Sequence, residues 1–281
     1  MSALTRQLTE HIENGEMSGR LWLYTNYHCN LACTYCLTES SPKVAPRRLD
    51  RSRMVDISKQ AASLGFTSIG LTGGEPFLEP DMVQSIDEIS GILPVTVLTN
   101  GTLFHTAKRL DAVSTLARKP VRLQISLDHP DADENDAMRG TGNFKRVAQA
   151  VPKLIERGVH VRIATTIEDE QPENAQRLDS LIASWGVRPE DHVRRPIIDR
   201  GRAGMTGLGV VAPLAALAPE LTLTVAGSFW TPFAPTYRDG KLQKDLMLTT
   251  RIEPLTHPVT ALLDVMGSTP RETGEAQSGF V

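Results

Sequence analysis

Cysteine is scarce in this chain of 281 residues, which contains only three. They are Cys29, Cys33 and Cys36, and the rest of the sequence has none. An odd number of cysteines confined to one short segment is not the pattern of a disulfide-stapled fold, so we exclude that class. The thiols therefore bind a metal, or one of them is reactive, or they are incidental.

Long hydrophobic runs and an excess of basic residues are also missing. The longest nearly apolar run, Val210–Ala218, contains a proline and is far shorter than the ~20 residues that cross a membrane. The first 20 residues have no apolar core of the signal-peptide type. The net charge of −3 does not favour nucleic-acid binding. We therefore expect a cytoplasmic protein that binds neither membranes nor nucleic acids.

The composition is that of a folded globular protein, with 40% hydrophobic and 22% charged residues. The chain length fits roughly two domains, or one barrel with an appendage. Short apolar segments alternate with segments of helical spacing, which predicts parallel strands joined by helical crossovers. The predicted strands are Leu21–Thr25, Ser68–Leu71, Pro94–Leu98, Val121–Leu127, Val159–Ile167 and His192–Ile198.

Six such units predict an α/β fold, which we interpret as a partial (β/α)6 TIM-like barrel with a short C-terminal extension, although a doubly wound sheet fits the alternation as well. Residues 1–19 form a polar N-terminal segment and 20–203 form the barrel. Residues 204–266 are predicted to be an extension or lid with one strand and one short helix. Residues 267–281 are expected to be a disordered tail.

The cysteine segment follows the first predicted strand, and its spacing is uneven. Structural zinc usually takes four ligands, and only His28 lies close enough in sequence to be the fourth. A [4Fe–4S] cluster normally takes one thiolate per iron, so three cysteines leave one iron open. An open iron can bind a substrate or cofactor, which predicts a reactive cluster. A structural zinc loop and inert buried thiols are the alternatives.

The segment His28-Cys29-Asn30-Leu31-Ala32-Cys33-Thr34-Tyr35-Cys36 resembles the cluster loop of the radical S-adenosylmethionine (SAM) superfamily. Gly73-Gly74-Glu75-Pro76, at the end of the second predicted strand, resembles the GGEP motif of the same family. The resemblance covers about residues 20–205. It implies that SAM chelates the open iron and is cleaved reductively to a 5′-deoxyadenosyl radical, which abstracts hydrogen from a polar substrate.

The resemblance also assigns the residues that contact SAM. The three cysteines hold the cluster, Tyr35 lies against the adenine, and Gly73 and Gly74 bring the backbone close to the ligand. Glu75 receives the SAM ammonium group, and Asn100 and Ser126 contact the ribose or carboxylate. Arg139 clamps a carboxylate. From the residues alone, each also fits a structural role: a helix-start carboxylate for Glu75, core packing for Tyr35, turn hydrogen bonds for Asn100 and Ser126, and a solvated surface position for Arg139.

The middle of the chain resembles peptide- and cofactor-modifying branches of the family. These branches often carry auxiliary clusters of the SPASM or twitch type, but no cysteine follows Cys36 here. We expect a peptide or natural-product substrate and an electron donor such as flavodoxin or ferredoxin. The alternatives are tetrapyrrole or cofactor biosynthesis and, in a different class, a non-catalytic Fe–S or zinc protein.

Four arginines, at 194, 195, 200 and 202, are candidates to hold an anionic substrate. An aromatic group at 230, 233 and 237 is a candidate lid.

Overall fold

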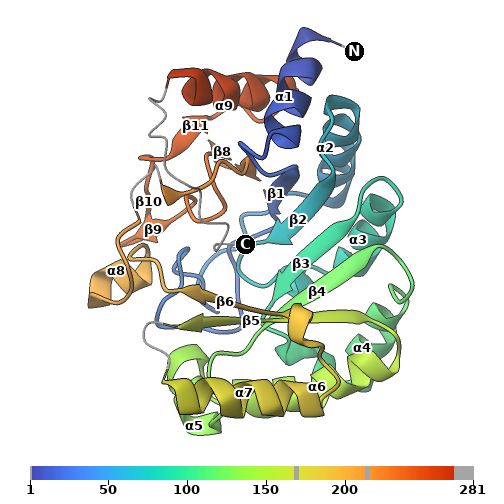
Figure 1. Cartoon of the computed structure of the whole chain (residues 1–281), viewed down its shortest axis with the longest axis vertical. Coiled ribbons are helices and arrows are strands. Elements are labelled where there is room, and N and C mark those ends of the chain that lie inside the picture. The colour runs from blue at the N-terminus through green and yellow to red at the C-terminus, as the bar shows by residue number, and fades with distance from the viewer. Residues whose placement is uncertain (1, 168–170, 213–215, 269–281) are drawn as a thin grey trace.

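The computed structural model describes residues 2–167, 171–212 and 216–268. Its main feature is a nine-stranded sheet with the order β11-β8-β7-β1-β2-β3-β4-β5-β6 (Figure 1). Each of the strands β2 to β6 pairs in parallel with the preceding strand. The six predicted strands are confirmed, with bounds that differ by one or two residues. They are β1 Arg20–Tyr24, β2 Ser68–Thr72, β3 Val95–Thr99, β4 Val121–Ser126, β5 His160–Ile167 and β6 His192–Pro196.

The crossover helices cover the outer face of these strands (Figure 1). Helix α2 begins where the Asp50 carboxylate accepts a hydrogen bond from the Arg53 N–H at 2.9 Å, as an N-cap residue does. It ends at Gly65, whose φ of 104° only glycine adopts readily. The helices are α2 Arg51–Leu64, α3 Met82–Ser90, α4 Ala107–Ser114, α5 Ala132–Arg139, α6 Asn143–Glu156 and α7 Pro172–Ser184, with short 3₁₀ turns at Pro76–Leu78, Thr102–His105 and Pro189–Asp191.

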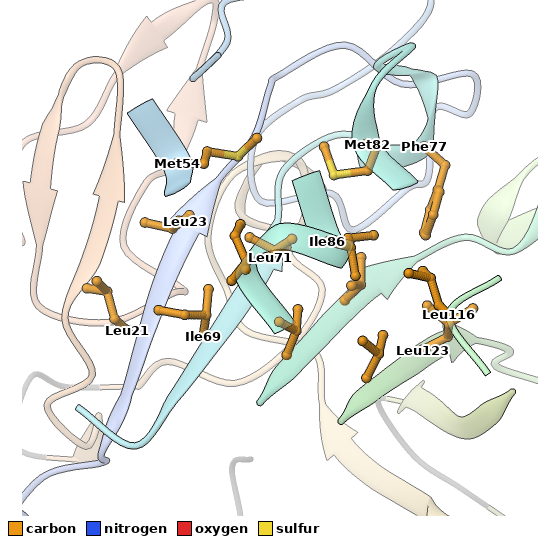
Figure 2. Packing of buried hydrophobic residues seen from close by; sticks show 14 of the residues in the cluster. Leu21, Leu23, Met54, Ile69, Leu71, Phe77, Met82, Ile86, Leu116 and Leu123 are labelled. Atoms are coloured by element: carbon orange, nitrogen blue, oxygen red, sulfur yellow. The ribbon is translucent and has the colours of Figure 1, made fainter. Parts of the chain in front are cut away.

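The alternation of side chains along each strand separates a core face from an inner face. Leu21 and Leu23 of β1, like Ile69 and Leu71 of β2, are fully buried against the helices (Figure 2). Each such side chain contributes roughly 1.5–3 kcal/mol when it leaves water. Residues that alternate with them, among them Trp22 of β1 and Thr72 of β2, line a cavity on the opposite face. The alternating hydrophobic pattern of the strands therefore determines which face packs against the helices and which face lines the cavity.

The two ends of the chain contain more regular structure than the sequence predicts. Helix α1, Ala3–Glu13, occupies the expected polar segment and buries Leu8. The predicted C-terminal strand and helix are confirmed as β7 Thr222–Thr224 and α9 Thr256–Ser268. Unpredicted short elements accompany them: α8 Arg202–Thr206, β8 Gly227–Phe229, β9 Tyr237–Arg238, β10 Lys241–Leu242 and β11 Met247–Thr249.

The C-terminal extension lengthens the sheet beside β1. Strand β7 pairs in parallel with β1, and β8 continues antiparallel from β7 (Figure 1). Among the described strands, β6 and β11 are the two edges, so the sheet is not a closed barrel. The predicted tail begins inside α9, and residues 269–281 lie outside the described residues. The division into domains stays a prediction. None of the helices in the described ranges has the length and apolar character needed to cross a bilayer.

Candidate active site

One cavity collects most of the residues that the sequence singled out. Its volume is about 1310 Å³, including the part that is open to solvent. It lies at the carboxyl ends of the parallel strands, where α/β proteins of this type bind their ligands. The predicted residues that line it are Cys29, Tyr35, Gly73, Gly74, Asn100, Ser126 and Arg139, together with Cys33 and Cys36. Glu75 is the one predicted residue that is not part of the lining.

The cysteine loop offers three separate thiols rather than a chelate for one ion. No three Cys, His, Asp or Glu side chains converge on a single-ion site anywhere in the described residues. A [4Fe–4S] cube instead takes one thiolate on each of several irons, so its ligands stand apart. His28 is turned away and contacts the Val44 carbonyl oxygen at 2.8 Å through Nδ1. The donor set therefore fits a cluster better than a single zinc ion.

The protonation of the thiols argues against a reactive free cysteine. Burial raises the pKa of Cys29 to about 12 and that of Cys33 to about 11, although the Arg139 charge opposes the shift at Cys33. Thiols with raised pKa values are poor nucleophiles at neutral pH. Iron binding requires the thiolate and releases the proton. Burial therefore disfavours Cys29 and Cys33 as reactive free thiols.

Arg202 fixes the backbone of the cysteine loop. Its N–H donates to the Cys36 carbonyl oxygen at 2.9 Å, and its guanidinium donates to the carbonyl oxygens of Cys33 and, at 3.1 Å, Ser40. Such charge-assisted bonds are stronger than neutral ones. Among the candidate substrate arginines, Arg202 thus holds the loop instead. Its place beside the loop arises only in the folded chain, and the sequence carried no signal for it.

The two glycines after β2 let this turn pack directly on the cysteine loop. A Cβ atom on Gly73 would lie 2.4 Å from the Asn26 carbonyl oxygen, and one on Gly74 would lie 2.1 Å from that of His28. The Gly74 N–H donates to the Asn26 oxygen at 3.0 Å, and the Glu75 N–H donates to the His28 oxygen at 2.9 Å. Glycine is required here because no side chain fits between the two segments.

Glu75 is fully buried and joins the ends of two strands. Its carboxylate accepts hydrogen bonds from the Thr99 hydroxyl and the Asn100 N–H, both at 2.7 Å, and from the Phe77 N–H at 3.1 Å. Burial raises the pKa of Glu75, while these bonds oppose the shift. The contact with the SAM ammonium group stays a prediction. The observed contacts give Glu75 a role in positioning Asn100 at the cavity wall.

A buried network joins Tyr35, Asp128 and Arg139. The Asp128 carboxylate accepts hydrogen bonds from the Tyr35 hydroxyl, from Arg139 at 2.9 Å and from the Thr166 N–H at 2.9 Å. Arg139 also donates to the Tyr35 oxygen, and its Nε atom is buried with no hydrogen-bond acceptor among the described residues. The sequence analysis gave Asp128 no role of its own. Its position two residues after Ser126, at the end of β4, was the available signal.

Asn100 and Ser126 offer polar groups to the cavity from β3 and β4. The Asn100 amide donates to Asn30 Oδ1 at 2.9 Å and to Cys29 Sγ at 3.7 Å, which ties it to the cysteine loop. The half-buried Ser126 hydroxyl makes no hydrogen bond within the described residues. Both positions suit contacts with a bound ligand.

The remaining candidates divide between structural and cavity positions. Arg194 pairs with Asp179 at 2.9 Å and Arg200 pairs with Asp245 at 2.7 Å, so Arg195 alone of the four arginines lines the cavity. Of the three aromatic residues proposed as a lid, Phe233 lines the cavity. Trp230 and Tyr237 pack in the protein interior instead.

The sequence model of the radical SAM superfamily matches residues 23–181, which is more than half of the chain and includes the cysteine loop and Glu75. The chain belongs to the radical SAM superfamily. It is a radical SAM enzyme, and the sequence resemblance is confirmed.

Curated relatives in this family have different activities. The chain is 32% identical over 165 residues to mycofactocin maturase MftC of Mycobacterium tuberculosis, covering 57% of this chain and 41% of the maturase. It is 31% identical over 204 residues to AdoMet-dependent heme synthase of Oleidesulfovibrio alaskensis, covering 71% of this chain and 51% of the synthase. The chain thus spans about half the length of these relatives.

A solved structure supports the fold. The chain resembles anSMEcpe with bound AdoMet and the Cp18Cys peptide, with a TM-score of 0.64 and 12% identity over 90% of this chain and 84% of that one. At this identity the likeness concerns the fold alone. It confirms the predicted α/β class for this radical SAM enzyme, with a mostly parallel sheet that is open within the described residues.

Proposed function

We propose that this radical SAM enzyme holds a [4Fe–4S] cluster through Cys29, Cys33 and Cys36 and binds SAM in the adjoining cavity. The observation that supports the proposal is that these three residues and six of the seven predicted SAM contacts line one cavity. Three thiolates leave one iron for SAM to chelate. When bound, the cluster supplies the electron that cleaves SAM to a 5′-deoxyadenosyl radical.

The protein's own groups bind, orient and shield the ligands. The backbone at Gly73 and Gly74 approaches the cavity with no side chain in the way. Ser126 and Asn100 hydrogen-bond the ribose or carboxylate of SAM, and Arg139 reaches its carboxylate through the guanidinium edge that Asp128 leaves free. Tyr35, held by Asp128, forms a fixed wall for the adenine. Shielding the site from water prevents side reactions of a radical intermediate.

The substrate we propose is a peptide or a peptide-like natural product, on which the radical abstracts hydrogen. The similarity to a maturase favours this class. Tetrapyrrole or cofactor biosynthesis is the second candidate, because the heme synthase matches a larger share of the chain. The reducing electron would come from a flavodoxin or ferredoxin. We place the protein in the cytoplasm.

The experiment is anaerobic reconstitution with iron and sulfide, followed by reduction with dithionite in the presence of SAM. We expect 5′-deoxyadenosine above the level of a Cys33→Ala variant. Thr34→Ala is the matched control, because Thr34 lies in the same loop and its exposed side chain makes a single hydrogen bond within the described residues, to the Met138 carbonyl oxygen at 3.4 Å. Iron loading without any response to SAM would contradict the proposal and favour a non-catalytic Fe–S protein. Stimulation of SAM cleavage by a peptide or by a tetrapyrrole would separate the two substrate classes.

A further inference from the structure

The cavity has a second side that the cluster and SAM assignments do not use. Beyond the cysteine loop its lining continues along the inner face of the sheet. Its polar residues include Arg20 of β1 and Thr166 of β5, and four others, which are Trp22 of β1, Gln124 of β4, Arg195 of β6 and Glu220, which precedes β7. We call these four residues the inner wall.

Trp22 presents a fixed hydrogen-bond donor with nothing to receive it. Its side chain is 4% exposed, and its indole N–H has no acceptor among the described residues. The ring cannot move toward β2, because it packs so closely on Gly70 that a Cβ there would lie 2.2 Å away. By contrast, the indole of Trp230 donates to the Leu217 carbonyl oxygen at 2.8 Å. A buried donor without an acceptor costs free energy unless a ligand satisfies it.

Arg195 brings a positive charge to the same wall without a counter-ion. It is half-buried and makes one long hydrogen bond, from Nε to the Thr166 hydroxyl at 3.4 Å. No carboxylate forms an ion pair with it in the described part of the chain. Burial and the neighbouring Arg139 charge lower the pKa of Arg195, although Tyr35 and Asp128 oppose this. The nearby Asp128 is already paired with Arg139.

The one carboxylate of the inner wall is compensated elsewhere. Glu220 is 3% exposed, and its Oε1 atom lies 3.7 Å from the Arg20 guanidinium, which offsets its charge but leaves this oxygen without a hydrogen bond in the described residues. Among the described residues, the donors of the inner wall that lack a partner therefore include the Arg195 cation and the buried indole N–H of Trp22. Both groups demand an acceptor, and a guanidinium matches a carboxylate or phosphate best.

We propose that Arg195 and the Trp22 indole bind a carboxylate of the substrate, either a peptide C-terminus or an acidic side chain. The inference rests on the proposed function only in calling this ligand the substrate, since the anion site itself follows from the two unpaired donors. Phosphate shares the same recognition chemistry and is separated from carboxylate in the test.

The test follows the indole N–H signals of the ¹⁵N-labelled, cluster-loaded protein by NMR. The chain has three tryptophans, and Trp22→Phe identifies the signal of Trp22. Triglycine, triglycine amide and inorganic phosphate are titrated separately at constant ionic strength. We expect triglycine to shift the Trp22 signal but not that of Trp230. The amide should have no effect, and phosphate should bind more weakly than triglycine. Equal responses to triglycine and its amide, or tighter binding of phosphate, would overturn the assignment.

Two arginine variants complete the test. Arg195→Gln should weaken triglycine binding at least about tenfold, as expected for the loss of a charge-assisted contact. Arg194→Gln should not, because that neighbour on β6 pairs with Asp179. SAM binding, measured by equilibrium dialysis, should be the same in both variants. Weaker SAM binding in Arg195→Gln with unchanged triglycine binding would refute the proposal. If the carboxylate titration succeeds but no 5′-deoxyadenosine forms, the anion site stands and the proposed function fails.

Discussion

The two sides of the cavity differ in how far the protein satisfies its own polar groups. Near the cysteine loop, the side chains of Glu75, Asn100 and Asp128 are all hydrogen-bonded within the chain, and only single groups such as Arg139 Nε and the Ser126 hydroxyl lack a partner among the described residues. On the inner wall, Trp22 has no acceptor and Arg195 has no counter-ion. Satisfied networks are rigid, which suits a cofactor that is always the same. Buried donors without an acceptor lower the stability of the free protein, and a bound ligand can supply the acceptor. Such donors therefore suit a substrate site.

The largest effect is expected at the cysteine loop. Cys33→Ala removes one of three proposed thiolate ligands, so iron content and 5′-deoxyadenosine formation should fall by about 100-fold or more, since even indirect ligand supports cost 10–100-fold. Iron analysis and mass spectrometry measure both. If Cys33→Ala formed 5′-deoxyadenosine at the wild-type level, Cys33 would not be a ligand of the cluster.

A smaller effect, on stability, is expected at the satisfied network. In Glu75→Gln, an amide NH₂ group replaces one carboxylate oxygen and faces a hydrogen-bond donor, so one hydrogen bond is lost. The free energy of unfolding should therefore fall by about 1–3 kcal/mol. Denaturant titration measures it. Glu10→Gln, at an exposed position of α1, is the matched control and should be neutral. An unchanged midpoint in Glu75→Gln would mean that this side of the cavity is not built from tightly coupled bonds.

On the inner wall we expect a substitution to raise the free energy of unfolding rather than lower it. Arg195→Met removes a half-buried cation that lacks a counter-ion, so the unfolding free energy should rise by about 0.5–1 kcal/mol. Arg194→Met, which breaks the pair with Asp179, should lower it by up to about 1 kcal/mol. Thermal and denaturant unfolding of the two variants provide the comparison. A loss of stability in Arg195→Met would indicate that the guanidinium is satisfied by the protein.

The smallest effect concerns the attachment of the C-terminal extension. The hydrogen bond from Arg200 lowers the pKa of Asp245 below its usual value of 3.8. A carboxyl group with a lowered pKa stabilises the fold above its ordinary pKa, and the contribution is lost as the pH falls through the lowered value. Because Asp245 is 54% exposed, Asp245→Asn should cost only about 0.5 kcal/mol at pH 7. The difference from wild type should shrink as the pH falls below 3.8 and vanish once the pH lies below the lowered pKa, and a difference that persists there would have another cause.

The six strands and most of the helices of residues 20–196 could be predicted because each carries a local signal, whereas the short helix α5 was not predicted. Leu21 and Leu23 alternate with inner-face residues, and Asp50 and Gly65 mark the ends of one helix. Helix α1 was missed because polar residues dominate Ala3–Glu13, where only Leu8 is buried. Strands β8 and β11 were missed because each has three residues, too few for an alternation to be recognised.

The candidate site was predicted where residues are close in sequence and missed where folding brings them together. The cysteine spacing and the glycines at 73 and 74 are visible as motifs, and the structure places them on one cavity. No local pattern could show that Arg202 reaches back to the cysteine loop, or that Asp128 joins Tyr35 to Arg139. The contact of Arg202 with Cys33 links positions 169 residues apart, and the contact of Tyr35 with Asp128 links positions 93 residues apart.

The sequence by itself determined the family, the parallel α/β class and the three cysteines, because each follows from short-range spacing. Only the tertiary structure decided how similar residues divide between roles. Arg194 and Arg195 are neighbours on β6, yet the pleat turns one toward Asp179 and the other into the cavity. Trp22 and Trp230 are both buried indoles, yet only one has an acceptor within reach. The physical reason is that a partner's position is set by the packing of distant segments, which no local pattern encodes.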